Sequence, residues 1–327
     1  MRQAPYLWYK APLFQQPLAQ AITANLMPTK ASNLLKILFA TTMVVGLGIW
    51  VHVSYGWIET LSRWNGVPVT FVIGGALFVV FSHIARVGRI HYAFNRLQPS
   101  PFRKILAVSL VHNTVSFLLP MRLGELALPA LSRHQLNIDI KYSMATLLLI
   151  RLFDAHVLLC LLVFFAGNLW LDEYAVIAPI ALVVSLPLGM HLLQAVGKRV
   201  GKIAFAMPLI ENQRTWITLY CYSVVIWSVK LFALALLAST LGHLPIDHAW
   251  IATIIADASA LSPITGFANA GTFELAFTLP LLPLGYASEP LVKTAVNVHL
   301  FIFIINICVG IAGFVLLESK RSPTSST

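Results

Sequence analysis

The sequence predicts an all-α integral membrane protein with about six full transmembrane helices and two re-entrant helical hairpins. Hydrophobic residues make up 58% of the 327 residues and charged residues only 10%, whereas a soluble domain carries about 25% charged residues. Apolar stretches of about twenty residues, the length that crosses a bilayer, recur along the chain. These observations exclude a soluble globule, a disulfide scaffold and a nucleic-acid-binding domain. The formal net charge of +10 is therefore interpreted as a signature of membrane topology.

The chain is expected to divide into three parts. Residues 1–33 contain several prolines and aromatic side chains but no apolar core of a secretory signal, and they form either an interfacial arm or a disordered tail. Residues 34–317 form a transmembrane domain, and residues 318–327 form a short cytoplasmic tail. The predicted full spans are 34–53, 67–87, 142–167, 174–195, 215–241 and 292–317.

Two further apolar regions, 105–131 and 249–288, are interrupted by proline and glycine. Such residues free backbone polar groups, which membrane depth tolerates only where protein or a water-filled cavity receives them. Each region is therefore predicted to enter the membrane as a hairpin and return to the same side. The two hairpins share a weak pattern, which indicates either an inverted repeat around a midplane site or chance recurrence. The pattern comprises Ser116, Pro120, Gly124 and Glu125 in the first hairpin, and Ser259, Pro263, Gly271 and Glu274 in the second.

The distribution of basic residues supports this topology. With both hairpins counted as non-crossing and the N-terminus in the cytoplasm, most lysines and arginines lie on the cytoplasmic side, including Arg86 and Arg89. Only Arg63 and Lys293 lie on the opposite side. This asymmetry is the positive-inside signal, and it predicts a multi-pass membrane protein with both termini cytoplasmic.

Ionisable side chains inside the predicted membrane regions are the candidate functional residues. Each costs about 2.5–3.5 kcal/mol to insert at a helix centre, so it tends to face a cavity or a counter-charge. Arg122 and Glu125 lie three residues apart beside the first helix break, where Arg122 could bind a phosphate or simply close the hairpin as an ion pair. Arg151 and Asp154 share one helix face, and Arg151 could instead extend to the membrane surface.

The remaining candidates lie in or near the second hairpin and the first hairpin tip. Glu274 could carry a proton or act as a counter-charge, and an ion pair with Lys230 is the alternative. Asp257 could bond backbone groups instead of a ligand. His112 lies four residues before Ser116, and a membrane histidine often only joins helices. Cys160, Cys221 and Cys308 lie apart in apolar stretches, so free thiols are expected, with no metal site and no cofactor.

Three short motifs occur in a fixed order in this hydrophobic chain. They are Pro120-Met121-Arg122-Leu123-Gly124-Glu125, Arg151-Leu152-Phe153-Asp154, and Pro263 through Gly266 and Gly271 to Glu274. This order resembles the flippase-like membrane domain at the N-terminus of bacterial lysylphosphatidylglycerol synthases, which also occurs as a stand-alone family. The resemblance covers residues 34–317. The family commonly has a Pro-Gly-Gly run where this chain has Thr265-Gly266-Phe267.

The resemblance implies lipid translocation between the leaflets of the bacterial inner membrane. The residues that it places near the lipid route are Arg122, Gly124, Glu125, Arg151, Asp154, Gly266, Gly271 and Glu274. The expected partner is a membrane lipid: a phospholipid, a glycolipid or a polyprenyl-linked substrate. Because the sequence stops at Thr327, the soluble aminoacyl-transfer domain is expected to be missing, and no enzymatic activity is predicted. Two alternatives remain, an integral-membrane transferase acting on a lipid-linked sugar and a non-transporting subunit of an envelope-synthesis complex. A homo-oligomer or a lipid-synthesis enzyme partner is compatible with each of them.

Overall fold

The computed structural model describes residues 42, 45–46, 48–171, 174–200, 205–261 and 266–318, and within these ranges every secondary-structure element is a helix. Among the residues that the structure describes, five helices are long and apolar enough to cross a membrane. They are α4 (Val69–Leu97), α7 (Ile140–Trp170), α8 (Ile177–Arg199), α10 (Gln213–Gly242) and α13 (Ser288–Glu318). The all-α membrane class predicted from the sequence is confirmed.

Shorter helices connect the long ones and form the two interrupted regions. They are α3 (Trp57–Leu61), η1 (Ser62–Trp64), α5 (Phe102–Leu118), η2 (Pro120–Leu126), α6 (Ala127–Leu136), α9 (Met207–Ile210), α11 (Ile246–Ala258), η5 (Ser259–Leu261), η6 (Phe267–Asn269), α12 (Thr272–Thr278) and η7 (Leu279–Leu284).

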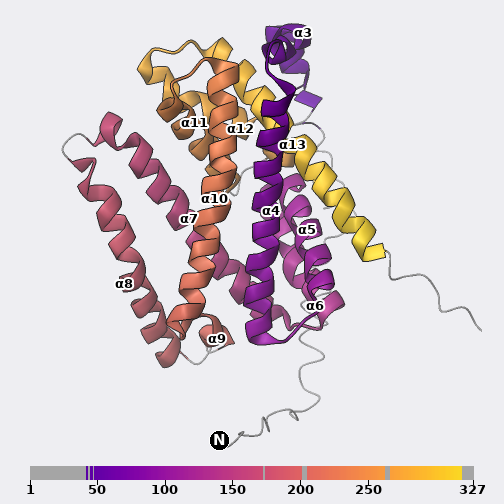
Figure 1. Cartoon of the computed structure of the whole chain (residues 1–327), viewed down its shortest axis with the longest axis vertical. Coiled ribbons are helices and arrows are strands. Elements are labelled where there is room, and N and C mark those ends of the chain that lie inside the picture. Colours follow the sequence, from indigo (N-terminus) through magenta and orange to yellow (C-terminus); the bar gives the residue numbers. More distant parts are fainter. Residues whose placement is uncertain are drawn as a thin grey trace, which may run out of the picture.

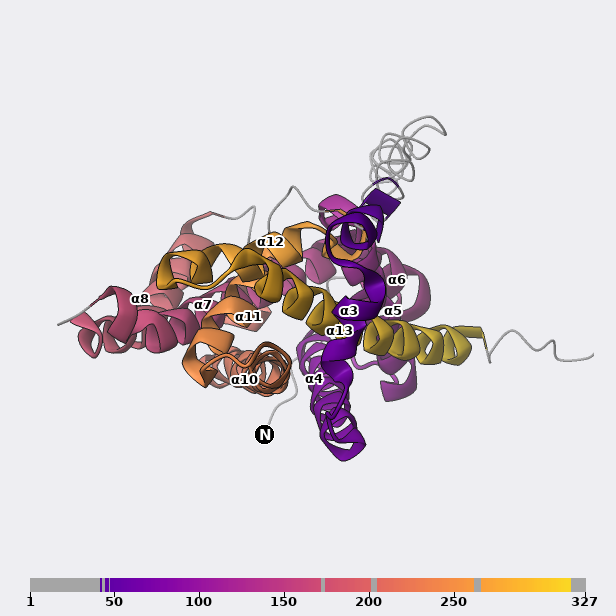
Figure 2. The same ribbon diagram turned by 90° about the horizontal axis from the view of Figure 1, so that it is seen from above.

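Helices α4 and α10 run side by side through the middle of the molecule, and α13 crosses beside α5 (Figure 1). Helix α8 packs against α7 and lies at the outer edge of the bundle (Figure 2). The buried face of α10 is rich in alanine, with Ala233, Ala235 and Ala238 each almost fully covered. Small residues let neighbouring helices approach closely in a membrane, where packing rather than hydrophobic exclusion drives association.

Both interrupted regions fold as two short helices that pack against each other. In the first, α5 and α6 flank the 3₁₀ segment η2; in the second, α11 and α12 flank a break that includes η6. The two helix pairs lie toward opposite ends of the bundle (Figure 1). Their breaks meet, since η2 contacts η6. The two breaks therefore lie next to each other in the structure.

Local sequence explains where the first hairpin turns. Leu119 is extended, as expected for the residue before a proline, and it ends α5 ahead of Pro120. The chain then folds back so closely that a Cβ atom on Gly124 would lie 2.5 Å from the Cα atom of Ser116 and would collide with the carbonyl oxygen of Val115. Only glycine fits at this position. At the base of the hairpin, the Lys104 ammonium donates to the carbonyl oxygen of Gln135 and ties the two helices together.

The bounds of two predicted spans are not reproduced by the described helices. The span 34–53 lies largely outside the described residues, so only its last turns are seen. The span 67–87 was predicted too short, because α4 continues without interruption to Leu97. Arg86 and Arg89 therefore lie on this helix, and their placement on the cytoplasmic side stays a prediction. No proline or glycine pair follows residue 87 until Pro99, so nothing in the backbone ends the helix earlier.

Candidate functional site

A chain of charged side chains connects the first hairpin to the centre of the bundle. Arg122 on η2 binds the same Glu125 oxygen through Nε at 3.1 Å and through a terminal nitrogen at 2.8 Å. The Nε of Arg151 on α7 lies 3.0 Å from that oxygen. Arg151 also lies 3.5 Å from Asp154, one turn further along α7. The structure thus brings together the four charged residues that the sequence placed in two separate pairs.

Arg89 completes this network, and the sequence did not indicate it. Its guanidinium binds both oxygens of Asp154, at 2.5 and 3.3 Å, and donates to Ser223 Oγ on α10 at 2.6 Å. Arg89 is 3% exposed and Asp154 is fully buried. Four elements, η2, α7, α4 and α10, are therefore joined by one set of ion pairs and hydrogen bonds. The sequence holds one signal that could have indicated Arg89: no residue after position 87 terminates the helix, so α4 can extend past this arginine.

The two ends of the network differ in exposure. The Arg122 and Glu125 side chains are 32% and 18% exposed, whereas Arg89 and Asp154 are sealed from solvent. Arg122 also has a left-handed backbone, with φ at 58°, which is uncommon for any residue except glycine. The arrangement has one anchored pair, Arg89 with Asp154, and one accessible pair, Arg122 with Glu125. An incoming anion can compete for Arg122 without disturbing the anchored pair.

A second buried group lies in the other hairpin. Glu274, in the first turn of α12, accepts a hydrogen bond from the backbone N–H of Gly271 at 2.7 Å. Its other oxygen lies 2.7 Å from Nδ1 of His299 on α13. The opposite ring nitrogen, Nε2, donates to the carbonyl oxygen of Ala268 at 2.8 Å, so Nε2 carries a hydrogen. Glu274 and His299 then share one proton across their contact.

Lys230 does not pair with Glu274, so the alternative drawn from the sequence was wrong. Its ammonium binds both oxygens of Asp257 on α11, at 2.6 and 2.8 Å. The Lys230 ammonium also lies over the ring of Trp227 on α10. The guanidinium of Arg86 on α4 lies over the same ring. Spacing along the sequence could not decide between two carboxylates that lie 17 residues apart in one interrupted region.

The glycines and the histidine of the sequence prediction have structural roles. Gly271 has φ at 81°, a conformation that glycine adopts without strain, and it starts α12. Gly266 is extended, and its carbonyl accepts from the N–H of Asn269. His112 is buried on α5 and contacts Ser116 Oγ at 3.2 Å. These residues shape the two breaks, and their predicted contact with substrate stays a prediction.

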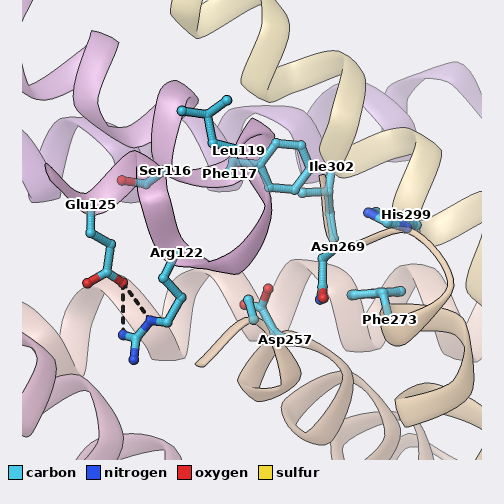
Figure 3. A pocket seen from close by; sticks show the side chains of 11 residues that line it. Ser116, Phe117, Leu119, Arg122, Glu125, Asp257, Asn269, Phe273, His299 and Ile302 are labelled. Carbon is cyan, nitrogen blue, oxygen red and sulfur yellow. Dashed lines mark hydrogen bonds and ion pairs between the residues drawn. The ribbon is translucent and has the colours of Figure 1, made fainter. Parts of the chain in front are cut away.

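A small cavity lies where the two hairpins meet (Figure 3). It holds about 50 Å³ of space, enough for a few water molecules but too little for a whole lipid headgroup. Arg122 and Glu125 line it from the first hairpin, and Asp257, Asn269 and His299 line it from the other side. The charge network, the Lys230–Asp257 pair and the Glu274–His299 pair therefore each have at least one member in the wall of this cavity.

Comparison with known protein families identifies the family of this chain. The family model of the lysylphosphatidylglycerol synthase transmembrane region matches residues 33–310. The chain belongs to this family. Searches of curated proteins and of solved structures find no match. The family and the five apolar helices together establish a multi-pass membrane protein related to membrane-lipid chemistry.

The Glu274 site makes a stability prediction. Glu274→Leu removes the acceptor of the Gly271 N–H and the partner of His299 Nδ1, two buried groups, and should lower the free energy of unfolding by about 2–3 kcal/mol. Glu274→Gln should remain close to wild type, because its amide can accept from Gly271 and donate to a neutral His299. Unfolding in detergent micelles measures both variants. Equal stability of the leucine and glutamine variants would show that these contacts contribute nothing.

Proposed function

We propose that this protein is a flippase-like transporter that moves a polar or phosphorylated lipid headgroup between the leaflets of a bacterial inner membrane. The observation that carries the proposal is the charge network of Arg122, Glu125, Arg151, Asp154 and Arg89, which ends in a cavity between two broken helix pairs. Buried charge of this kind is costly, and in membrane proteins it marks routes for polar substrates.

The accessible end of the network is suited to an anionic headgroup. Arg122 can release Glu125 and bind two phosphate oxygens with its planar guanidinium. Glu125 then keeps Arg151 as its counter-ion, at 3.0 Å, so no carboxylate is left unpaired. The acyl chains stay in the lipid while the headgroup crosses along the hairpins, which lowers the cost of taking a polar group through hydrocarbon.

The proposed orientation follows from the charged helix ends. Arg96, Arg103, Lys141, Arg199 and Arg214 lie near the ends of α4, α5, α7, α8 and α10 that gather at one end of the bundle (Figure 1). The positive-inside rule places that end in the cytoplasm. The first hairpin then enters from the cytoplasmic side and the second from the outside, as two re-entrant hairpins that meet at membrane depth. We further propose that the protein transports lipid without enzymatic activity of its own.

Transport by purified protein in liposomes tests the proposal. Wild-type protein should move fluorescent phosphatidylglycerol between leaflets, and Arg122→Ala should slow this by about 10- to 100-fold, the value of a charge-assisted hydrogen bond. Glu125→Gln should also slow transport, because Arg122 and Arg151 lose their shared counter-ion. Labelled lipid exposed to a membrane-impermeant quencher gives the rate.

The matched control is Arg133→Ala. Arg133 is an exposed arginine of α6 in the same hairpin, and it does not line the cavity. It should transport at the wild-type rate. Rates that fall equally in Arg122→Ala and Arg133→Ala would contradict the site, and a wild type no faster than protein-free liposomes would contradict the function.

A further inference from the structure

Asn269 has a buried acceptor atom without a partner. The side chain is 7% exposed, and its Nδ2 donates to Ser259 Oγ at 2.9 Å. Its Oδ1 has no hydrogen-bond partner among the described residues. A buried polar atom left unpaired is costly, and such atoms in native structures call for an explanation. Asn269 lies in η6, at the break of the second hairpin.

The orientation of the Asn269 amide is fixed by its neighbour. Ser259 has one hydroxyl hydrogen, which it donates to the carbonyl oxygen of Ala256 at 2.6 Å. Ser259 can then only accept from Asn269, so the amide must present its NH₂ group to Ser259 and its Oδ1 away from it. Turning the amide by 180° would place two acceptors against each other. The free atom is therefore an oxygen, and it requires a hydrogen-bond donor.

Asn269 itself belongs to a wall of the cavity. Figure 3 shows Asn269 pointing to the side on which Asp257 and Phe273 lie, across from Arg122 and Glu125. The carboxylates in the cavity wall already have cations, because Glu125 is bound by Arg122 and Asp257 by Lys230. Asn269 Oδ1 is the buried side-chain oxygen of the described cavity wall that still needs a donor.

The backbone at this position is held in an unusual conformation. Asn269 has φ at 65° and the preceding Ala268 has φ at 49°. Asparagine tolerates the left-handed region better than most residues, but alanine does not. Two successive left-handed residues thus occur where Asn269 lines the cavity, and the Ala268 carbonyl is fixed by His299 at 2.8 Å. Local strain of this kind is concentrated at ligand-binding positions.

We propose that Asn269 recognises the end of the lipid headgroup by accepting, at Oδ1, a hydrogen bond from a hydroxyl or ammonium group. This inference rests on the proposed lipid site and adds a specificity to it. The cavity of about 50 Å³ fits the terminal group of a headgroup, with Arg122 on the opposite wall for an anionic oxygen. Lipids whose headgroup carries no N–H or O–H cannot make this bond and are bound less tightly.

Three short-chain probes test the specificity: phosphatidylglycerol with hydroxyl donors, phosphatidylethanolamine with an ammonium donor, and phosphatidylcholine with neither. Their affinities for the full chain in detergent are measured from the lipid-dependent rise in unfolding temperature. The variant is Asn269→Gly, which removes the amide and suits the left-handed backbone. The matched control is Asn137→Gly, since Asn137 is also left-handed, with φ at 56°, but caps α6 away from the cavity.

Wild-type protein should bind the two donor lipids more tightly than phosphatidylcholine. Asn269→Gly should weaken binding of the donor lipids by about three- to tenfold, the value of one hydrogen bond, and leave phosphatidylcholine unchanged. The unfolding temperature of Asn269→Gly without added lipid, compared with that of wild type, separates recognition from a folding defect. Asn137→Gly should behave as wild type.

The outcomes separate this inference from the proposed function. An equal loss for all three lipids, no loss, or no preference in the wild type would overturn the role of Asn269. Donor-dependent binding with no transport in liposomes would support that role and overturn the transport function. Transport with no headgroup-dependent effect of Asn269→Gly would support the transport function and overturn the role of Asn269. Absence of both binding and transport would overturn both.

Discussion

Replacing Asp154 by asparagine is expected to lower the free energy of unfolding by about 3–5 kcal/mol, the cost of removing one partner from a buried ion pair. The substitution keeps the shape of the side chain but leaves Arg89 without a counter-charge in a fully buried site. It also removes the second counter-ion of Arg151, at 3.5 Å. Reversible unfolding in mixed micelles with a graded denaturing detergent measures the change.

The control for Asp154 is another aspartate at the start of the same helix. Asp139→Asn changes the residue that caps α7, where asparagine is equally suitable. Its ion pair with Lys141 is long, at 3.9 Å, and both side chains are half exposed, so the change should stay below about 1 kcal/mol. Arg89→Met combined with Asp154→Leu should recover much of the loss, because no unpaired charge then remains at this pair. Similar unfolding of Asp154→Asn and Asp139→Asn would show that the pair is not buried as described.

Replacing Gly124 by alanine should disrupt the first hairpin. The new Cβ would lie 2.5 Å from the Ser116 Cα atom and would collide with the Val115 carbonyl oxygen, and both are backbone atoms. Neither can move without separating α5 from η2, so the loss should be at least about 3 kcal/mol, at or above the usual cost of overpacking. Transport should be lost as well, because Arg122 and Glu125 lie on the displaced segment. Yield of monodisperse protein and unfolding in micelles measure the effect.

Gly74→Ala is the matched substitution on α4, where the added Cβ meets no atom within 4 Å. It should be neutral or slightly stabilising, because alanine favours a helix over glycine. If both alanine variants fold and unfold alike, the close approach of η2 to α5 does not exist, and the hairpin geometry that presents Arg122 to the cavity must be abandoned.

The elements that the sequence predicted well are those that composition and covalent geometry control. Apolar length alone located the five long helices, and Pro120 and Gly124 located the first break because their effects on the backbone are local. The Arg122–Glu125 and Arg151–Asp154 pairs could be predicted because residues three apart on a helix or a tight turn are neighbours in space.

Pairing between distant segments could not be predicted in the same way. Arg89 and Asp154 lie 65 residues apart, and Lys230 and Asp257 lie 27 apart. Which carboxylate a cation meets depends on how α4, α7, α10 and α11 pack. This packing cannot be predicted from the spacing of residues in a single sequence. Asn269 was missed for a different reason, since its importance lies in an oxygen that has no partner among the described residues, which only the surrounding hydrogen bonds reveal.

The central claim is that water reaches the charged cavity between the two hairpins at membrane depth, and cysteine labelling tests it most directly. In a variant without Cys160, Cys221 and Cys308, a single cysteine replaces either Ser116, which lines the cavity, or Ile304, which is exposed on the apolar outer surface of α13. Hydroxyl radicals, which are no larger than water, are then generated in membrane vesicles by brief irradiation, and oxidation of each cysteine is measured by mass spectrometry. The account predicts that Ser116→Cys is modified and Ile304→Cys is not. Protection of both positions to the same degree would contradict it.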